Sequence, residues 1–265
     1  MNHIAKRTIT ALTTASLVVG LLLYLPFSVV LPAMIVLVAL VHLEFSQMVA
    51  RKHEIMTWAG VVTGVAWLVC AFYSGVAQKV AAGILLAAFL ALWVKTLFGN
   101  AQRPLSSLGT TLLGLFYIPF MLTWFIKIPQ VHGMMMLLYT VAIIKISDMG
   151  GFAFGVAFGK HKMCPKISPG KSWEGMAGSI FASIVISCAF MPLTHFVWWK
   201  AIAFGVVAAV VGTLGDLVES RFKRECEVKD SATFMPAGLG GFLDMFDSLI
   251  FAPAVLFPFI DFSVT

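Results

Sequence analysis

Nine apolar segments occupy most of this 265-residue sequence, and they constrain its fold more than any other feature. Only 11% of the residues are charged and 60% are hydrophobic, which leaves too little polar surface for a soluble domain of this length. A membrane-spanning helix needs about 20 apolar residues. We therefore predict an all-α polytopic integral membrane protein with about nine transmembrane helices, over residues 8–24, 27–43, 57–73, 80–97, 107–126, 133–158, 175–191, 196–215 and 241–260.

The first two segments are short, and Leu25 and Pro26 leave almost no loop between them. They form either a tight hairpin or one broken element. Lys6 and Arg7 followed by an apolar run superficially resemble a signal peptide. No small-residue cleavage site is evident and many apolar segments follow, so we interpret this run as the first span.

The distribution of Lys and Arg predicts the orientation of these helices. If the N-terminus is cytoplasmic, fourteen basic residues fall in cytoplasmic loops and flanks, three fall outside, and Lys145 lies within a span. Because basic residues concentrate on the cytoplasmic side, this bias supports nine spans with a cytoplasmic N-terminus. It also places two large polar loops, 159–174 and 216–240, in the cytoplasm. The net charge of +6 then reports topology, and we predict no nucleic-acid partner.

The most polar stretch, Gly215–Ser248, holds seven acids and four bases between two apolar segments. Asp216 and Glu219 are three residues apart at the end of one segment, and Asp244 and Asp247 are three apart at the start of the next. On helices, each such pair shares a face. Bases lie between the two pairs at Lys223, Arg224 and Lys229. Carboxylates that can hold a hard cation, beside bases that can hold phosphates, suit Mg²⁺-assisted phosphoryl or nucleotidyl chemistry.

A second polar stretch begins inside the sixth segment, at Lys145 and Asp148. These two residues form either a buried ion pair beside small-residue helix packing or part of a polar cavity. The loop that follows carries four lysines, which either mark the cytoplasmic side or bind a triphosphate as point charges. They are Lys160, Lys162, Lys166 and Lys171. We exclude a P-loop, because its first glycine would fall at Pro165 and no buried parallel strand precedes it.

These two stretches resemble the signature of phosphatidate cytidylyltransferases, the CDP-diacylglycerol synthases, over roughly residues 145–260. Residues 220–232 fit the pattern S-x-F-K-R-x4-K-D-x-A without exception. Residues 148–175 show Asp-x-Gly, Gly-Lys, Pro-Lys-x-Ser-Pro-x-Lys and Trp-Glu-Gly. The sequence departs from the family at Leu239, where a His is usual, and at Met245, where an Arg is usual. One extra residue also lies between Pro236 and Gly240.

The resemblance implies transfer of CMP from CTP to phosphatidate, giving CDP-diacylglycerol and pyrophosphate for phospholipid synthesis. It implies an enzyme of the bacterial inner membrane whose site faces the cytoplasm, with Mg²⁺ and, in the family, a second monovalent cation. A homodimer is left open. The implied metal ligands are Asp216, Asp244 and Asp247. The catalytic set adds Ser220, Lys223, Arg224 and Lys229, and the substrate-binding set is Asp148, Lys166, Ser168, Lys171 and Glu219.

Residues 131–265 thus form the predicted C-terminal catalytic region, and residues 1–130 the N-terminal transmembrane helices. Other functions stay open. A CTP-dependent kinase of a polyprenol or phytol-type alcohol would need a base to deprotonate the alcohol. A cation-coupled transporter would spread its acids through the membrane midplane and carry few basic loops. A scaffold would need none of these acids, and a diverged relative would show weak activity. The acids cluster beside basic loops, which favours phosphate chemistry.

Overall fold

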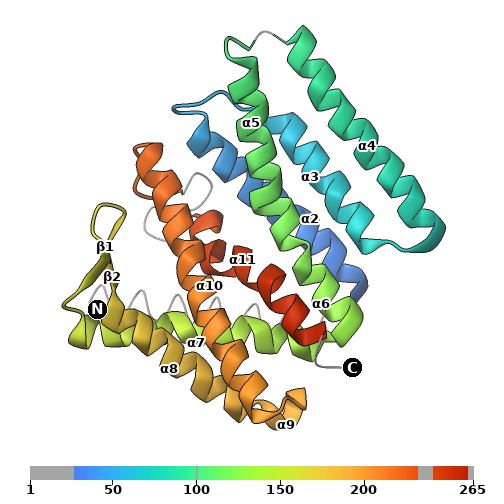
Figure 1. Cartoon of the computed structure of the whole chain (residues 1–265). Helices are drawn as coiled ribbons and strands as arrows, with labels where there is room; N and C mark the ends of the chain where they lie inside the picture. Colours follow the sequence, from blue (N-terminus) through green and yellow to red (C-terminus); the bar gives the residue numbers. More distant parts are fainter. Residues whose placement is uncertain (1–26, 100, 232–240, 262–265) are drawn as a thin grey trace.

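The computed structural model describes residues 27–99, 101–231 and 241–261, and within them helices dominate (Figure 1). The N-terminal helices are α2 (Phe27–Val49), α3 (Thr57–Phe72), α4 (Gly75–Phe98), α5 (Pro104–Leu115), the π-helical turn η1 (Phe116–Phe120) and α6 (Trp124–His132). The C-terminal elements are α7 (Met134–Phe158), the strands β1 (Lys162–Cys164) and β2 (Ser168–Ser172), α8 (Trp173–Ala189), α9 (Met191–Thr194), α10 (Trp198–Glu225) and α11 (Phe242–Asp261).

The predicted apolar segments correspond to helices wherever the structure describes them, and segment 8–24 lies outside the described residues. Six described helical stretches are long and apolar enough to cross a membrane: Leu31–Val49, Gly75–Phe98, Pro104–His132, Met134–Phe158, Trp198–Glu225 and Phe242–Asp261. Helices α3 and α8 are apolar but shorter, with 16 and 17 residues. These lengths and compositions fit a polytopic membrane protein.

Two polar ranges differ from the expected loops. Helix α10 continues to Glu225, so the first ten residues of the range 216–240 are helical. The reason is that Val218 and Phe222, four residues apart, still pack against the core, so the helix has an apolar stripe after its hydropathy falls. Within 159–174, β1 and β2 form an antiparallel hairpin, a small exception to the all-α prediction.

Local sequence signals set several helix boundaries. The Ser172 side chain accepts a hydrogen bond of 3.1 Å from the Gly175 backbone N–H and so caps the start of α8. Pro104 occupies the first turn of α5, where its missing N–H costs nothing. Between α6 and α7, Gly133 has a φ of 82°, which a residue with a side chain rarely adopts. Pro119 lies inside η1, which joins α5 to α6.

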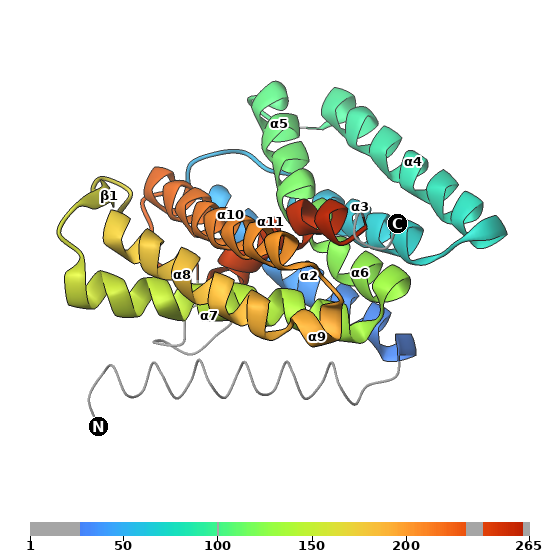
Figure 2. The ribbon, with the colours of Figure 1, turned by 60° about the horizontal axis from the view of Figure 1, so that its bottom comes forward.

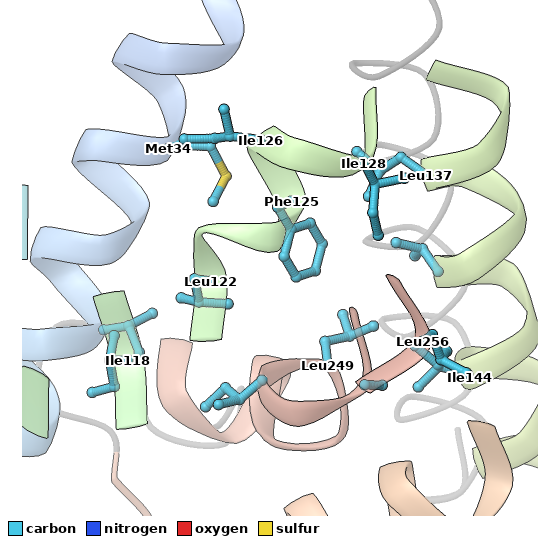
Figure 3. Close-up of a cluster of buried hydrophobic side chains, with 14 of the residues drawn as sticks. Met34, Ile118, Leu122, Phe125, Ile126, Ile128, Leu137, Ile144, Leu249 and Leu256 are labelled. Atoms are coloured by element: carbon cyan, nitrogen blue, oxygen red, sulfur yellow. The ribbon is translucent and has the colours of Figure 1, made fainter. Parts of the chain in front are cut away.

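One hydrophobic core joins the two halves of the chain. Figure 3 shows part of it, where Met34 of α2, Leu122 next to η1, Phe125 of α6, Ile144 of α7 and Leu249 of α11 converge. Helix α11 packs against α10, α7, α6 and α2, so it is held from several sides. Helix α4 lies at the outer edge in both Figure 1 and Figure 2. The residues of α11 therefore lie at the centre of the bundle.

Helices α7, α8 and α10 approach one another through glycines. Helices α7 and α8 lie side by side in both views (Figures 1 and 2). A Cβ added at Gly150 of α7 would lie 2.7 Å from the Gly178 carbonyl oxygen of α8. A Cβ at Gly205 of α10 would lie 2.9 Å from the backbone of Ile184 in α8. Small residues allow this close packing in membranes, where helices associate mainly by van der Waals contact.

We expect Gly205→Ala to destabilise the protein by about 1–3 kcal/mol, because the added methyl overpacks a backbone contact that cannot move away. The matched control is Gly83→Ala on α4, where a Cβ would meet nothing within 4 Å. Thermal unfolding of the purified variants in detergent measures both. Equal melting temperatures for the two variants would show that the α8–α10 contact is not close-packed.

Candidate active site

An acidic cluster lies where α10 and α11 meet, and it consists of Asp216, Glu219 and Asp247. One carboxylate oxygen from each residue lies within 4.8 Å of the other two. Gly215 permits this arrangement, since a Cβ there would collide with the backbone carbonyl of Asp247. Because α10 and α11 approach so closely at Gly215, Asp216 of α10 lies beside Asp247 of α11. Glu219 is buried, whereas Asp216 and Asp247 are partly exposed.

Lys223 connects this cluster to the fourth acid of the predicted site. Its Nζ lies 2.5 Å from Glu219 Oε2 and 2.9 Å from Asp244 Oδ1. Asp244 Oδ2 also accepts hydrogen bonds from the backbone N–H of Ser231 at 3.3 Å and of Gly241 at 2.8 Å. Asp244 thereby ties Lys223 to the two residues that flank segment 232–240, and its oxygens already have donors.

The sequence-predicted metal ligands are therefore only partly brought together. Asp216 and Asp247 lie in the acidic cluster as expected. Glu219, predicted to bind substrate, supplies the third carboxylate of the cluster, and Asp244 binds Lys223 and backbone donors instead. Sequence spacing did not separate the two roles, because each acid is three residues from its neighbour on its own helix.

The hairpin brings basic groups and backbone acceptors to the same place. Lys171 Nζ of β2 lies 2.7 Å from Asp216 Oδ2, and Ser220 Oγ donates to Asp216 Oδ1 at 3.2 Å. Arg224 Nε donates to the Ile167 carbonyl oxygen at 3.2 Å, which joins the end of α10 to the hairpin turn. Two contacts thus hold the hairpin beside the acidic cluster, and they come from Lys171 and Arg224.

The remaining predicted basic residues lie farther out. Lys166 in the hairpin turn and Lys229 after α10 are both exposed, and Ser168, at the start of β2, is half-buried. Leu239, one of the departures from the family pattern, lies outside the described residues. Because Lys166 and Lys229 are exposed, each could bind a polyanion such as a triphosphate as a point charge.

The base of the hairpin is held by Glu174 in the first turn of α8. Its carboxylate accepts from the backbone N–H groups of Lys160 and His161, each at 3.2 Å, and lies 2.6 Å from His161 Nδ1. The side-chain hydrogen bond with His161 is the largest cause that lowers the pKa of Glu174 to about 2. Glu174 therefore stays ionised throughout the physiological pH range and keeps the hairpin attached to α8.

Helix α7 adds two charged residues, Lys145 and Asp148, that contact α11. Lys145 Nζ donates to the Met245 carbonyl oxygen at 3.2 Å and to Ser248 Oγ at 3.3 Å, and it lies 3.9 Å from Asp148 Oδ2. Ser248 Oγ in turn donates to Asp148 Oδ2 at 2.8 Å. The sequence left open a buried ion pair or a polar cavity here. The structure shows Lys145 and Asp148 partly exposed and 3.9 Å apart, and Ser248, which follows Asp247, bonds to both.

Glu44 of α2 is a residue of the site region to which the sequence assigned no role. It is fully buried, and its Oε2 accepts a hydrogen bond of 2.9 Å from the Leu243 backbone N–H. Leu243 lies in the first turn of α11, so Glu44 satisfies a free N–H there and complements the helix dipole. An acid at the end of the apolar segment 27–43 was the available signal, but its partner is 199 residues away in the chain.

The acidic cluster fits a hard divalent cation. Three carboxylate oxygens at this separation repel one another, and the buried Glu219 is costly to leave ionised without compensation. Lys171 and Lys223 each contact one member, Asp216 and Glu219 respectively. Oxygen ligands are those that Mg²⁺ prefers, and Mg²⁺ is usually held by one or two carboxylates together with substrate phosphates. The donor set thus suits Mg²⁺ beside a bound phosphate.

We expect Asp216→Asn and Asp247→Asn to weaken Mn²⁺ binding by about 10–100-fold or more, because mutating residues that only hydrogen-bond to a metal's ligands already lowers its affinity by that factor. Electron paramagnetic resonance measures the binding. Asp244→Asn should weaken it less, because Asp244 contacts Lys223 and backbone donors. The control is Asp230→Asn, which removes an exposed acid next to Ser231. Equal loss in Asp244→Asn and Asp247→Asn would return Asp244 to the metal-binding set.

Comparison with known proteins identifies the family of this chain. The model of the cytidylyltransferase family matches residues 5–263. A phosphatidate cytidylyltransferase of Haemophilus influenzae is 41% identical over 124 residues, which cover 44% of this chain and 43% of that protein. Enzymes of the same name from Staphylococcus aureus (strain COL) and Staphylococcus saprophyticus are 40% and 38% identical over 127 residues, 47% of this chain and 48% of each. The chain thus spans about half the length of the curated relatives that it matches, and it belongs to the cytidylyltransferase family.

Proposed function

We propose that this protein transfers CMP from CTP to phosphatidate and releases CDP-diacylglycerol and pyrophosphate. The observation that carries the proposal is the acidic cluster of Asp216, Glu219 and Asp247, with Lys171 and Lys223 in contact with it. Relatives named phosphatidate cytidylyltransferase support the choice of substrates. A cluster that joins carboxylates to cations suits a reaction in which phosphates bind, react and leave.

The reaction needs positioning and charge neutralisation more than proton transfer. A lipid phosphate oxygen attacks the α-phosphorus of CTP in line, a new P–O bond forms, and the bond to the β-phosphate oxygen breaks. The electron pair leaves with pyrophosphate. The attacking phosphate is already ionised near pH 7, so no strong general base is required. An alcohol acceptor would need one, which separates this proposal from a lipid kinase.

The residues of the site take different parts in this proposal. Asp216, Glu219 and Asp247 would hold Mg²⁺, which supplies charge neutralisation for the triphosphate. Lys171 and Arg224 hold the hairpin over the cluster, and Lys223 adds a cation between two acids. Asp244 positions Lys223, and Ser220 orients Asp216. Asp148, Lys166, Ser168 and Lys229 stay predicted substrate contacts.

The topology belongs to the same proposal. We propose nine spans with the N-terminus and the acidic cluster on the cytoplasmic side of a bacterial inner membrane, where CTP is available. The excess of basic residues in the predicted cytoplasmic loops supports this orientation. A second, monovalent cation stays a prediction from the family resemblance, and a homodimer stays open.

The direct test uses purified protein in detergent with phosphatidate, Mg²⁺ and CTP that carries its label on the cytosine ring. We expect the label to enter the lipid phase, and a chelator to abolish the transfer. If no ring label enters lipid, the assay is repeated with γ-phosphate-labelled CTP and a polyprenol. Transfer of that label alone would replace this proposal with a lipid kinase, and no transfer of either label would refute both activities.

We expect Lys171→Gln to lower kcat/KM by roughly 10–100-fold, because it removes a cation that contacts the acidic cluster where charge is transferred. Stability should change little, since Lys171 is partly exposed. Lys79→Gln removes an exposed cation on α4 and serves as the matched control. Turnover in Lys171→Gln equal to that of the control would show that the hairpin does not reach the substrate.

A further inference from the structure

Tyr117 is a buried tyrosine whose hydroxyl lacks a hydrogen bond. Its side chain is only 4% exposed, and no atom of the described residues hydrogen-bonds to its Oη. Tyr139, equally buried in the same core, shows the usual outcome, with Oη 2.8 Å from Ser187 Oγ. Because buried polar groups are nearly always paired, the free hydroxyl of Tyr117 needs an explanation.

The ring of Tyr117 lies between the two helices that carry the acidic cluster. Its centroid is 5.3 Å from that of Phe222 on α10, in an edge-to-face arrangement, and 5.6 Å from that of Phe251 on α11. Phe222 follows Glu219 by three residues, and Phe251 follows Asp247 by four. Residues three or four apart share a helix face, so Tyr117 contacts the same faces that carry these two acids.

The hydroxyl is also within electrostatic range of the whole acidic cluster. The carboxylates of Glu219, Asp247 and Asp216 all lie near enough for their charges to act on it. A phenol has one proton to donate. None of the three carboxylates accepts that proton in a hydrogen bond. This proton therefore has no acceptor among the described residues.

The backbone that carries Tyr117 is fixed in an unusual conformation. Tyr117 belongs to the π-helical turn η1, and such turns are frequent at functional sites. The adjacent Pro119 packs closely on α3, since a Cβ added at Gly64 would lie 2.7 Å from Pro119 Cγ. Figure 3 shows the neighbouring Ile118 and Leu122 directed into the core. The residues that follow Tyr117 therefore hold the turn against α3 and the core.

We propose that Tyr117 is a further residue of the active site and that its hydroxyl donates a hydrogen bond to a non-bridging phosphoryl oxygen bound at the acidic cluster. This inference rests on the proposed function. The oxygen belongs either to CTP or to phosphatidate, whose phosphates share this chemistry. The N-terminal half, through η1, then supplies a substrate contact to a site whose other residues come from residues 145–248.

The test is Tyr117→Phe, which keeps the ring and its contacts and removes only the hydroxyl. We expect kcat/KM to fall roughly 10-fold or more, because losing one preorganised donor to a reacting oxygen costs about 10²–10³ in rate. A rise in KM for CTP alone would assign the oxygen to CTP, and a rise for phosphatidate alone would assign it to the lipid. A kcat/KM within twofold of wild type for both substrates would overturn the proposal.

Two further variants separate the hydroxyl from packing. Tyr139→Phe removes a buried hydroxyl that is bonded to Ser187, so it should change the melting temperature but leave kcat and both KM values unchanged. Tyr117→Leu removes ring and hydroxyl together. If Tyr117→Phe turns over normally and only Tyr117→Leu fails, the residue acts through packing and the proposal is wrong.

A binding measurement keeps this inference distinct from the proposed function. Calorimetry with CTP, inorganic pyrophosphate and Mg²⁺, and with phosphatidate in nanodiscs, needs no turnover. If the wild type binds these probes without forming a lipid product, the proposed function fails. Weaker binding of any one of them by Tyr117→Phe would still support the hydroxyl contact. If the wild type shows no turnover, unchanged affinity of Tyr117→Phe for all probes would refute the hydroxyl contact.

Discussion

Like-charge repulsion is the constraint on which the site depends. Three carboxylates, from Asp216, Glu219 and Asp247, are held within 4.8 Å of one another in a protein built largely of apolar helices. The close approach of α10 and α11 at Gly215 forces them together, and α11 is itself held by α2, α6, α7 and α10. Such an arrangement persists when nearby cations or a bound proton offset the repulsion. Lys171 and Lys223 do this in part, and a divalent ion with substrate phosphates would complete it.

The two halves of the chain contribute to the site in different ways. The C-terminal half supplies the charges, on α7, the hairpin, α10 and α11. The N-terminal half supplies the frame: Glu44 caps α11, and Lys52, in the turn after α2, forms an ion pair of 2.8 Å with Glu227 just beyond α10. Glu44 thus holds the start of α11, and Lys52 contacts the chain just beyond the end of α10. The N-terminal helices thus act on the site by fixing the geometry of α10 and α11.

The sequence predicted the helices and the composition of the site, but not the partners within it. Apolar segments long enough to cross a membrane identify helices directly, because the membrane leaves few alternatives. Spacing placed Asp216 beside Glu219 and Asp244 beside Asp247, yet only the packing of α10 on α11 determines which acid faces which. In that packing Glu219 lies in the acidic cluster, and Asp244 accepts a hydrogen bond from Lys223.

The continuation of α10 past residue 215 was missed because hydropathy falls where the charges begin, although Val218 and Phe222 keep the helix packed against the core. Glu44 and Tyr117 were missed because their partners are far away in the sequence.

The position of the bound metal tests this account most directly. Anomalous scattering from Mn²⁺ in crystals grown with CTP would place the ion without any assumption about activity. The account predicts a peak in contact with Asp216, Glu219 and Asp247. A peak bound by Asp244 and Asp247 without Glu219, or no peak within reach of these acids, would contradict the assignment of the acidic cluster as the metal site.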